Sequence, residues 1–467
     1  MRKSFVLGAA ALAAMAVAPS IADAGEVKMG GYYMFRMINS DDTPQKDTNT
    51  TALSDDANYW AHRLQLNMDF IASPKTHAHM VTRVIDSVPV EGADSALADG
   101  SSVTTANAAA ADTLWDIRQA WLETEAWGVG LKVGNMPISL HDNILVGVDT
   151  TSFGTIMLSK SFGDITLVAA NVRVDENVTG NGGKISTVAA GGLAGGGSDD
   201  DDEDVYVLSL LGKAANINYQ ATVAYYDAGK YSTTSTLTTS GTGQDSDDLW
   251  LGLTVGGDFG GVDLTGTVLY EGGADNISTT ASAWQKQLEG DDFLVALRAK
   301  GKTGFGGWNA YGFYAGEDFN SITAGNAAWS PTWDEGGPGA EDLFTTLFAG
   351  NDDAVLAAQS NSDMTRNMWG IGAGLSINAG GWNIAPSLDY ASVVEDIVQY
   401  NGGAANSQAD YDSAWGGALT LSTEIDKGTT LALGASFADP DKGPGNNSTT
   451  EDPDTMHFVH ASVKMKF

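Results

Sequence analysis

Apolar and polar residues alternate with a period of two along much of the chain, a pattern typical of β-strands whose two faces meet different surroundings. The alternation runs over 26–37 and again over 59–71. In the second run, one face carries Trp60, Leu64, Leu66, Met68 and Phe70, and the other carries Tyr59, Arg63, Gln65, Asn67 and Asp69. These runs are roughly ten to thirteen residues long, whereas strands of soluble sandwiches have about five or six. Their length predicts strands that cross a membrane.

Short and long connections alternate strictly between the strand-like runs. Tight turns are expected at 73–75, 127–128, 162–164, 213–216, 259–261, 303–307, 379–381 and 425–428. Polar stretches rich in Gly, Asp, Ser and Thr lie at 39–57, 87–112, 135–153, 174–203, 227–247, 271–290, 316–363, 396–411 and 438–454. Membrane barrels have tight turns at one end and long loops at the other. The sequence therefore predicts an all-β, antiparallel up-and-down transmembrane barrel of 18 strands, or of 16 if the hairpin at 154–173 is absent.

The composition favours one β-barrel domain over a helical protein. Glycine accounts for 57 of 467 residues, against a usual frequency of about 7 %, and helix interiors are destabilised by glycine. Charged residues are 18 % and the mean hydropathy is -0.12, values that exclude a helical membrane bundle. Because no later stretch is continuously apolar over about 18 residues, only a closed barrel of strands could span a bilayer.

Residues 1–24 are expected to be a signal peptide. Arg2 and Lys3 form a positive start, 5–18 is an apolar run too short to span a bilayer, and 22–24 fits a cleavage site. We therefore expect export, with 25–467 forming a single barrel in the cell outer membrane and membrane lipid as a partner.

Charge and cysteine content remove several classes of partner. The net charge of -35 argues against nucleic acid, because phosphate binding needs a basic face. The chain has no Cys, which excludes a lipid-anchored lipoprotein, a covalent c-type haem and disulfides. No cofactor is expected, and no arrangement for nucleophilic catalysis is evident, so an enzyme is not expected.

Two motifs suggest metal binding only weakly. Carboxylates are the ligands that Ca²⁺ prefers, and the weak candidates are Asp199, Asp200, Asp201 and Asp202. They lack the ligand spacing and central Gly of a Ca²⁺ loop, so a solvated acidic loop tip is the favoured interpretation. His77 and His79 share one strand face, but no third ligand is apparent.

The C-terminal segment 456–467 alternates apolar and polar residues and stops on Phe467. This ending resembles the terminal strand of Gram-negative outer-membrane porins. The segment 115–121, followed by 130–134, resembles a strand-turn-strand unit of porin-like proteins. The resemblance implies a general-porin-like barrel, an ion- and solute-conducting diffusion channel, and a homo-oligomer, namely a trimer.

Basic residues occupy the expected non-lipid face of the first five strands. They are Lys28, Arg36, Arg63, Arg83, Arg118 and Lys132. Because sequential strands are neighbours in an up-and-down barrel, these residues should line one wall of the lumen. They are interpreted as one side of a charged constriction; the alternative is that they only make the lumen polar.

The third long loop, 135–153, resembles in its order the loop that folds into the channel of general porins and narrows it. Its expected constriction residues are His141, Asp142 and Asp149. The loop also carries apolar residues that need a wall to pack against, namely Met136, Ile138, Leu140, Ile144, Leu145 and Val146. The alternative is a rim loop that covers a neighbouring subunit.

Two functions remain for such a barrel. The first is a porin, a water-filled channel for passive diffusion of small hydrophilic solutes and ions through a charged constriction. The second is a structural or surface-interaction barrel whose long loops bind a partner. The stretch 316–363, with Trp329 and Trp333, favours the second, because exposed aromatic residues mark recognition surfaces.

The alternation also predicts which side chains contact lipid. Near the aromatic girdles of the barrel we expect Tyr33, Trp60, Trp115, Trp121 and Phe467.

Substitutions at 65 and 66 test the predicted faces. Leu66→Arg, on the lipid face, should lower the free energy of unfolding by about 2 to 4 kcal/mol if the residue lies near the midplane. Gln65→Arg, on the opposite face, should change it little. Urea unfolding in lipid vesicles measures both, and equal penalties would show that the two faces are exchanged.

Overall fold

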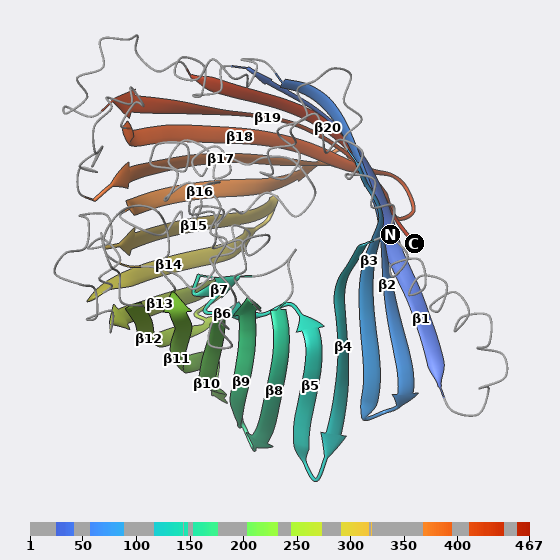
Figure 1. Ribbon diagram of the computed structural model, residues 1–467. Coiled ribbons are helices and arrows are strands. Elements are labelled where there is room, and N and C mark those ends of the chain that lie inside the picture. Colours follow the sequence, from blue (N-terminus) through green and yellow to red (C-terminus); the bar gives the residue numbers. More distant parts are fainter. Residues whose placement is uncertain are drawn as a thin grey trace.

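The computed structural model describes residues 25–41, 57–87, 116–142, 144–147, 153–175, 203–231, 244–272, 291–316, 319, 368–394, 411–442 and 455–467. The expected signal peptide, 1–24, lies outside them, as do most of the long loops. Eighteen strands form one closed antiparallel sheet, and a short two-stranded sheet lies inside the ring (Figure 1). None of the described residues forms a helix with the length and hydropathy needed to cross a membrane.

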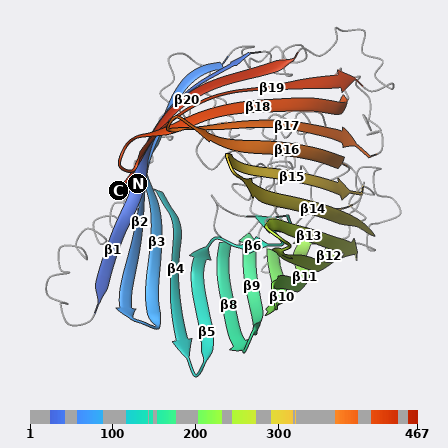
Figure 2. The same cartoon turned by 180° about the vertical axis from the view of Figure 1, so that it is seen from behind.

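The barrel strands follow the chain in order around the ring, as Figure 2 shows from behind. Their bounds are β1 Glu26–Asp41, β2 Ala57–Ser73, β3 Thr76–Ser87, β4 Asp116–Ala126, β5 Val129–Met136, β8 Phe153–Phe162, β9 Ile165–Asp175, β10 Glu203–Ala214, β11 Ile217–Tyr231, β12 Gln244–Asp258, β13 Val262–Gly272, β14 Asp291–Thr303, β15 Gly306–Ala315, β16 Met368–Ala379, β17 Trp382–Val393, β18 Tyr411–Asp426, β19 Thr429–Lys442 and β20 Met456–Lys466. The prediction of 18 strands is confirmed, and the hairpin that could have reduced it to 16 is present as β8 and β9.

Closure of the ring depends on the pairing of the first and last strands. β1 pairs with β20 over a register in which Tyr33 lies opposite Met465. Two backbone hydrogen bonds extend the seam past the strand end: the Gly31 N–H donates to the Phe467 carbonyl at 3.0 Å, and the Phe467 N–H donates to the Gly31 carbonyl at 3.1 Å. The last residue of the chain is therefore part of the closed ladder, which leaves no free sheet edge there.

All eight predicted tight turns connect neighbouring strands at one end of the barrel. The turn after β4 shows why this spacing works. Trp127 and Gly128 both have positive φ, 54° and 72°, as the two central residues of a type I′ hairpin turn require. The two strands continue directly from such a turn into the twisted ladder, so two residues are enough to connect them.

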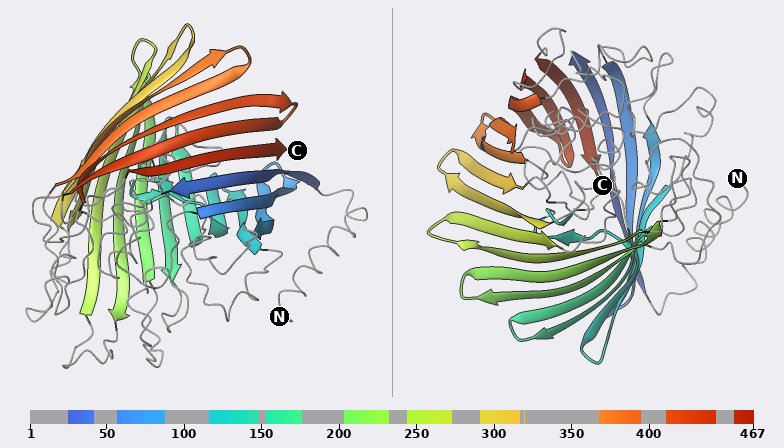
Figure 3. Two further views of the ribbon diagram at one scale, coloured as in Figure 1. Left: turned by 90° about the horizontal axis from the view of Figure 1, so that it is seen from above. Right: turned by 60° about the vertical axis from the view of Figure 1, so that its left-hand side comes forward.

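The two faces of the sheet differ as the alternation predicts. Figure 3 shows the strands that form these two faces from two further directions. The outward face carries exposed apolar residues, and aromatic side chains form a band near its long-loop end. This band comprises Tyr206, Tyr225, Tyr270, Phe293, Tyr314, Trp369, Tyr390, Trp415 and Phe437. Several members contact across strands; the ring centroids of Phe293 and Tyr314 are 5.5 Å apart. Amphipathic rings at this height are typical of a membrane interface.

One predicted lipid contact is wrong. Trp121 points to the lumen, where its ring stacks on His79 with a centroid distance of 4.7 Å. The cause is a β-bulge: Gln119 pairs with Val81 and Ile117 pairs with Thr82, so Arg118 is an extra residue. Each bulge residue reverses the faces beyond it. Tyr33 and Phe467 lie on the outward face as predicted, whereas Trp115 and the Trp60 side chain lie outside the description.

The seam predicts a role for the last residue. Deleting Phe467 removes two backbone hydrogen bonds from the closing ladder, so we expect the free energy of unfolding to fall by about 2 kcal/mol. Phe467→Ala keeps both hydrogen bonds and should cost less than the deletion. Urea titrations of the refolded variants measure the difference, and an equal loss for both would assign the effect to the aromatic ring alone.

Candidate pore constriction

The loop between β5 and β8 folds into the lumen. Two short strands, β6 Ser139–Leu140 and β7 Val146–Gly147, pair with each other inside the ring (Figure 1). Six apolar side chains of this segment are at most 8 % exposed: Met136, Ile138, Leu140, Ile144, Leu145 and Val146. The segment 136–147 is called the docked loop below; residue 143 lies outside the description.

The docked loop is buried against an apolar region of the lumen wall. The two surfaces form a single hydrophobic cluster. On the wall this cluster includes Val172, Val205, Val207, Ala224, Trp250, Leu269, Leu294, Ala296, Tyr311 and Phe313. Such a surface would be costly to leave in water, at about 25 cal/mol for each Å². Covering it holds the loop to the wall formed by β9 to β15.

His141 sits at the tip of the docked loop and is fully buried. Its Nδ1 lies 2.8 Å from the Thr254 hydroxyl, which lies 2.8 Å from the Thr267 hydroxyl. Its backbone N–H donates to the Gln220 side-chain carbonyl at 3.3 Å. The ring lies so close to Gly252 that a Cβ there would overlap it. Burial lowers the pKa of His141 to about 4, so the docked imidazole is neutral at neutral pH.

Asp142 fixes the same tip to the wall by charge. The Arg298 guanidinium donates to the Asp142 carboxylate at 2.7 Å, joining the loop to β14. Both His141 and Asp142 have positive φ, 54° and 58°, a conformation that only a few non-glycine residue types tolerate. The strained tip is held in place by contacts with three different strands, β11, β12 and β14.

Five of the six predicted basic residues lie on β1 to β4, strands across the ring from the docked loop (Figure 1), and the sixth, Lys132, lies on β5. Arg63 pairs in register with Met34, two residues from Arg36, and Arg83 pairs with Gln65, two residues from Arg63. Arg118 is the bulge residue next to this row on β4. The register therefore places four arginines on four adjacent strands, each offset by about two residues from the one before. We call these four residues the arginine row.

The two predicted lysines lie apart from the arginine row, nearer the turn end. Lys28 is paired with Glu26 at 3.7 Å, and Lys132 is paired with Glu123 at 2.9 Å. Each lysine is thus partly neutralised by a carboxylate on the same lumen face.

β20 contributes lumen residues that the sequence reasoning missed. Lys464 pairs in register with Met34 and lies over the Tyr32 ring, 4.9 Å from its centroid. The Tyr32 hydroxyl donates to the Gln65 side chain at 3.3 Å. The alternation over 456–467 already separated Lys464 from the outward face; knowledge that β20 neighbours β1 would have added it to the basic wall.

Below the arginine row, a stack of flat rings lines β3 and β4. The His77 and His79 rings are parallel, with centroids 6.2 Å apart, and His79 also stacks on Trp121. His79 Nδ1 is 2.5 Å from the Asp69 carboxylate. The described part of the chain holds no group of three or more His, Asp or Glu side chains arranged for a metal.

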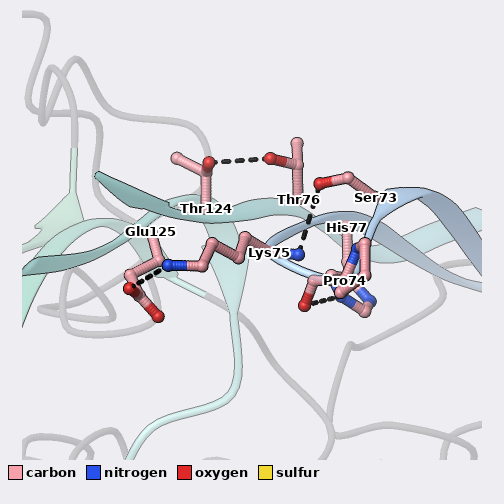
Figure 4. A network of polar contacts seen from close by, with 7 residues as sticks. All are labelled: Ser73, Pro74, Lys75, Thr76, His77, Thr124 and Glu125. Atoms are coloured by element: carbon pink, nitrogen blue, oxygen red, sulfur yellow. Dashed lines mark hydrogen bonds and ion pairs between the residues drawn. The ribbon is translucent and has the colours of Figure 1, made fainter. Parts of the chain in front are cut away.

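The turn between β2 and β3 is tied to β4 at the same end of the barrel (Figure 4). The Lys75 ammonium contacts the Glu125 carboxylate at 2.6 Å, and the hydroxyls of Thr76 and Thr124 are 2.9 Å apart. The backbone N–H of Lys75 donates to the Ser73 hydroxyl at 3.2 Å. These contacts fix the lower edge of the wall that carries the arginine row.

Several sequence candidates fall outside the described residues. They are Asp149, Asp199, Asp200, Asp201 and Asp202, and the aromatic pair Trp329 and Trp333. The weak metal site and the surface-binding loop therefore stay predictions.

Comparison with solved structures identifies the same architecture in proteins of very different sequence. The chain is similar to Pseudomonas aeruginosa OccK9 (OpdG), with a TM-score of 0.53, 13 % identity, and coverage of 96 % of this chain and 99 % of the other. It is also similar to P. aeruginosa OpdO, with a TM-score of 0.52, 12 % identity, and coverage of 94 % and 97 %. No protein-family model and no curated protein matches the sequence. The likeness establishes the fold, a porin-like barrel.

The tip contacts predict a measurable coupling. Asp142→Asn and Arg298→Gln should each destabilise the docked loop, and the double variant should lose less than the sum, with a coupling of about 1 kcal/mol. The matched control is the Lys75 and Glu125 pair, whose side chains are 63 % and 43 % exposed; its coupling should be below about 0.5 kcal/mol. Urea unfolding of all six single and double variants gives both values, and additivity at 142 and 298 would contradict the pairing.

Proposed function

We propose that the chain is an outer-membrane porin, a water-filled channel through which small hydrophilic solutes and ions diffuse passively. The observation that carries this proposal is the arginine row facing the docked loop across a closed 18-stranded ring. A barrel of this size is too wide for wall side chains to fill, so its interior holds a channel. The docked loop narrows that channel from one side only, opposite the basic wall.

The setting proposed for this channel is the outer membrane. The outward face carries apolar residues with an aromatic band at the long-loop end, which matches the surface that membrane lipid contacts. Residues 1–24 would direct export and then be removed. Assembly as a trimer follows from the resemblance to general porins and is part of the proposal.

Two sets of charges act on a permeating ion. The chain carries a net charge of -35, so the channel mouths concentrate cations at low salt. That attraction is screened over about 10 Å at 0.1 M ionic strength. The arginine row acts at short range, where low-dielectric walls strengthen the interaction. Anionic solutes are therefore stabilised at the narrow section, while the mouths favour cations.

Reversal potentials in planar bilayers test the arginine row. Arg63→Ser combined with Arg118→Ser should shift the reversal potential toward cation selectivity, because two fixed positive charges leave the narrow section. The control is Arg173→Ser, which removes an arginine whose cross-strand partner is Asp204 and whose strand face is the outward one. That variant should leave the reversal potential unchanged.

The same recordings separate the two candidate functions. A protein that inserts without forming conducting channels would favour the alternative, a barrel whose long loops bind a surface partner. Conduction with no shift in the double variant would place the two arginines outside the ion path, and the proposed constriction would then be wrong.

A further inference from the structure

His141 differs from the apolar contacts of the docked loop because its charge can change with pH. Its ring is enclosed by the wall, with Nδ1 facing the Thr254 hydroxyl and Nε2 against Gly252. Within the described residues, Nε2 is buried and has no hydrogen-bond partner. The site thus offers one hydrogen-bonding position to an imidazole that has two ring nitrogens.

The available hydrogen-bond partners determine which protonation state of the His141 ring is favoured. In the neutral tautomer with a proton on Nδ1, the ring donates to the Thr254 hydroxyl, which in turn donates to Thr267. Only a bare nitrogen then faces Gly252. In the protonated ring, Nε2 carries a hydrogen that meets no acceptor, and a full positive charge is buried. An unpaired buried donor that is also charged is strongly destabilising.

The surroundings of the ring do not compensate that charge. β11, β12 and β13 present the neutral residues Gln220, Thr254 and Thr267. The carboxylate of Asp142, next in the chain, is engaged by Arg298 of β14. The other charged lumen-facing residues of β11 to β14 lie farther along the strands toward their ends; they are Asp248, Asp258, Asp263, Glu271, Asp292, Lys300 and Lys302.

We propose that His141 is an acid-sensitive latch of the docked loop: the neutral imidazole holds the loop tip in its slot beside Gly252, and protonation releases the tip from the wall. The ion pair between Asp142 and Arg298 and the apolar packing of the loop against the wall remain. The loop therefore stays attached to the protein, but its tip loses its fixed position. The effect on conduction rests on the proposed channel function; the release itself does not.

The sign and range of the effect follow from linkage. Burial lowers the pKa of His141 from 6.5 to about 4, so the released loop binds the proton more tightly than the docked loop does. Docking is therefore unaffected above about pH 6.5. The ratio of docked to released loop falls about tenfold for each pH unit from there down to about pH 4.

A spin label on the docked loop measures the release directly. The natural chain has no Cys, so Ser139→Cys, at an exposed position of β6, carries the sole thiol. In vesicles, the electron paramagnetic resonance spectrum should show an immobile label at pH 7.5. The spectrum should gain a mobile component as the pH falls from about 6.5 to about 4, and the change should reverse on neutralisation.

Three variants identify the group responsible. His141→Asn keeps a side-chain donor toward Thr254, tolerates the left-handed backbone and cannot become charged, so its label should stay immobile down to pH 4. Gly252→Ala fills the slot, so its label should be mobile at all pH values. His77→Gln with His79→Gln removes two lumen histidines outside the slot and should keep the wild-type transition.

The outcomes decide the proposal independently of conduction. A transition that persists in His141→Asn would assign the release to a carboxylate such as Asp142 and overturn the latch. A wild-type label that stays immobile at pH 4 would overturn it as well. If the label behaves as expected while no channel conducts, the latch stands and the proposed channel function fails.

Discussion

Every strand of this barrel depends on one constraint: inside a bilayer, each backbone N–H and C=O must be hydrogen-bonded by the protein itself. An open sheet would leave one strand edge unpaired in lipid. The pairing of β1 with β20, extended by the two hydrogen bonds between Gly31 and Phe467, satisfies that requirement. Closure over 18 strands then produces an interior wider than wall side chains can fill, and the rest of the structure concerns what occupies that space.

The interior is divided between two kinds of wall. From β9 to β15 the lumen face carries an apolar patch, and the docked loop covers that patch. From β20 through β4 the lumen face is polar and basic, and the described residues place no such loop against it. The docked loop thus has two effects. It shields apolar surface from water, and it narrows the space between itself and the opposite, charged wall.

The sequence predicts the fold further than it predicts the site. Alternation and turn spacing give the strand count and all eight turns, because each is a local property of the chain. The predicted inward and outward faces are wrong where a β-bulge adds one residue, as at Arg118. Nothing in the alternation up to Gln119 indicates the bulge, so the face predicted for Trp121 is the opposite of the one it occupies. The apolar residues of 136–146 indicate packing against a wall. The identity of that wall and the slot beside Gly252 depend on contacts between residues more than a hundred positions apart in the sequence.

Those distant contacts also order the events of folding. His141 is separated from Thr254 by 113 positions in the chain, and Asp142 is separated from Arg298 by 156. The loop precedes in synthesis every strand from β8 to β14 that completes its binding surface. It cannot complete its docking until β11, β12 and β14, which carry its polar partners, are aligned, so its burial belongs to the late, high-contact-order part of assembly. Until then, an incomplete barrel carries an uncovered apolar wall on the side that will become its interior.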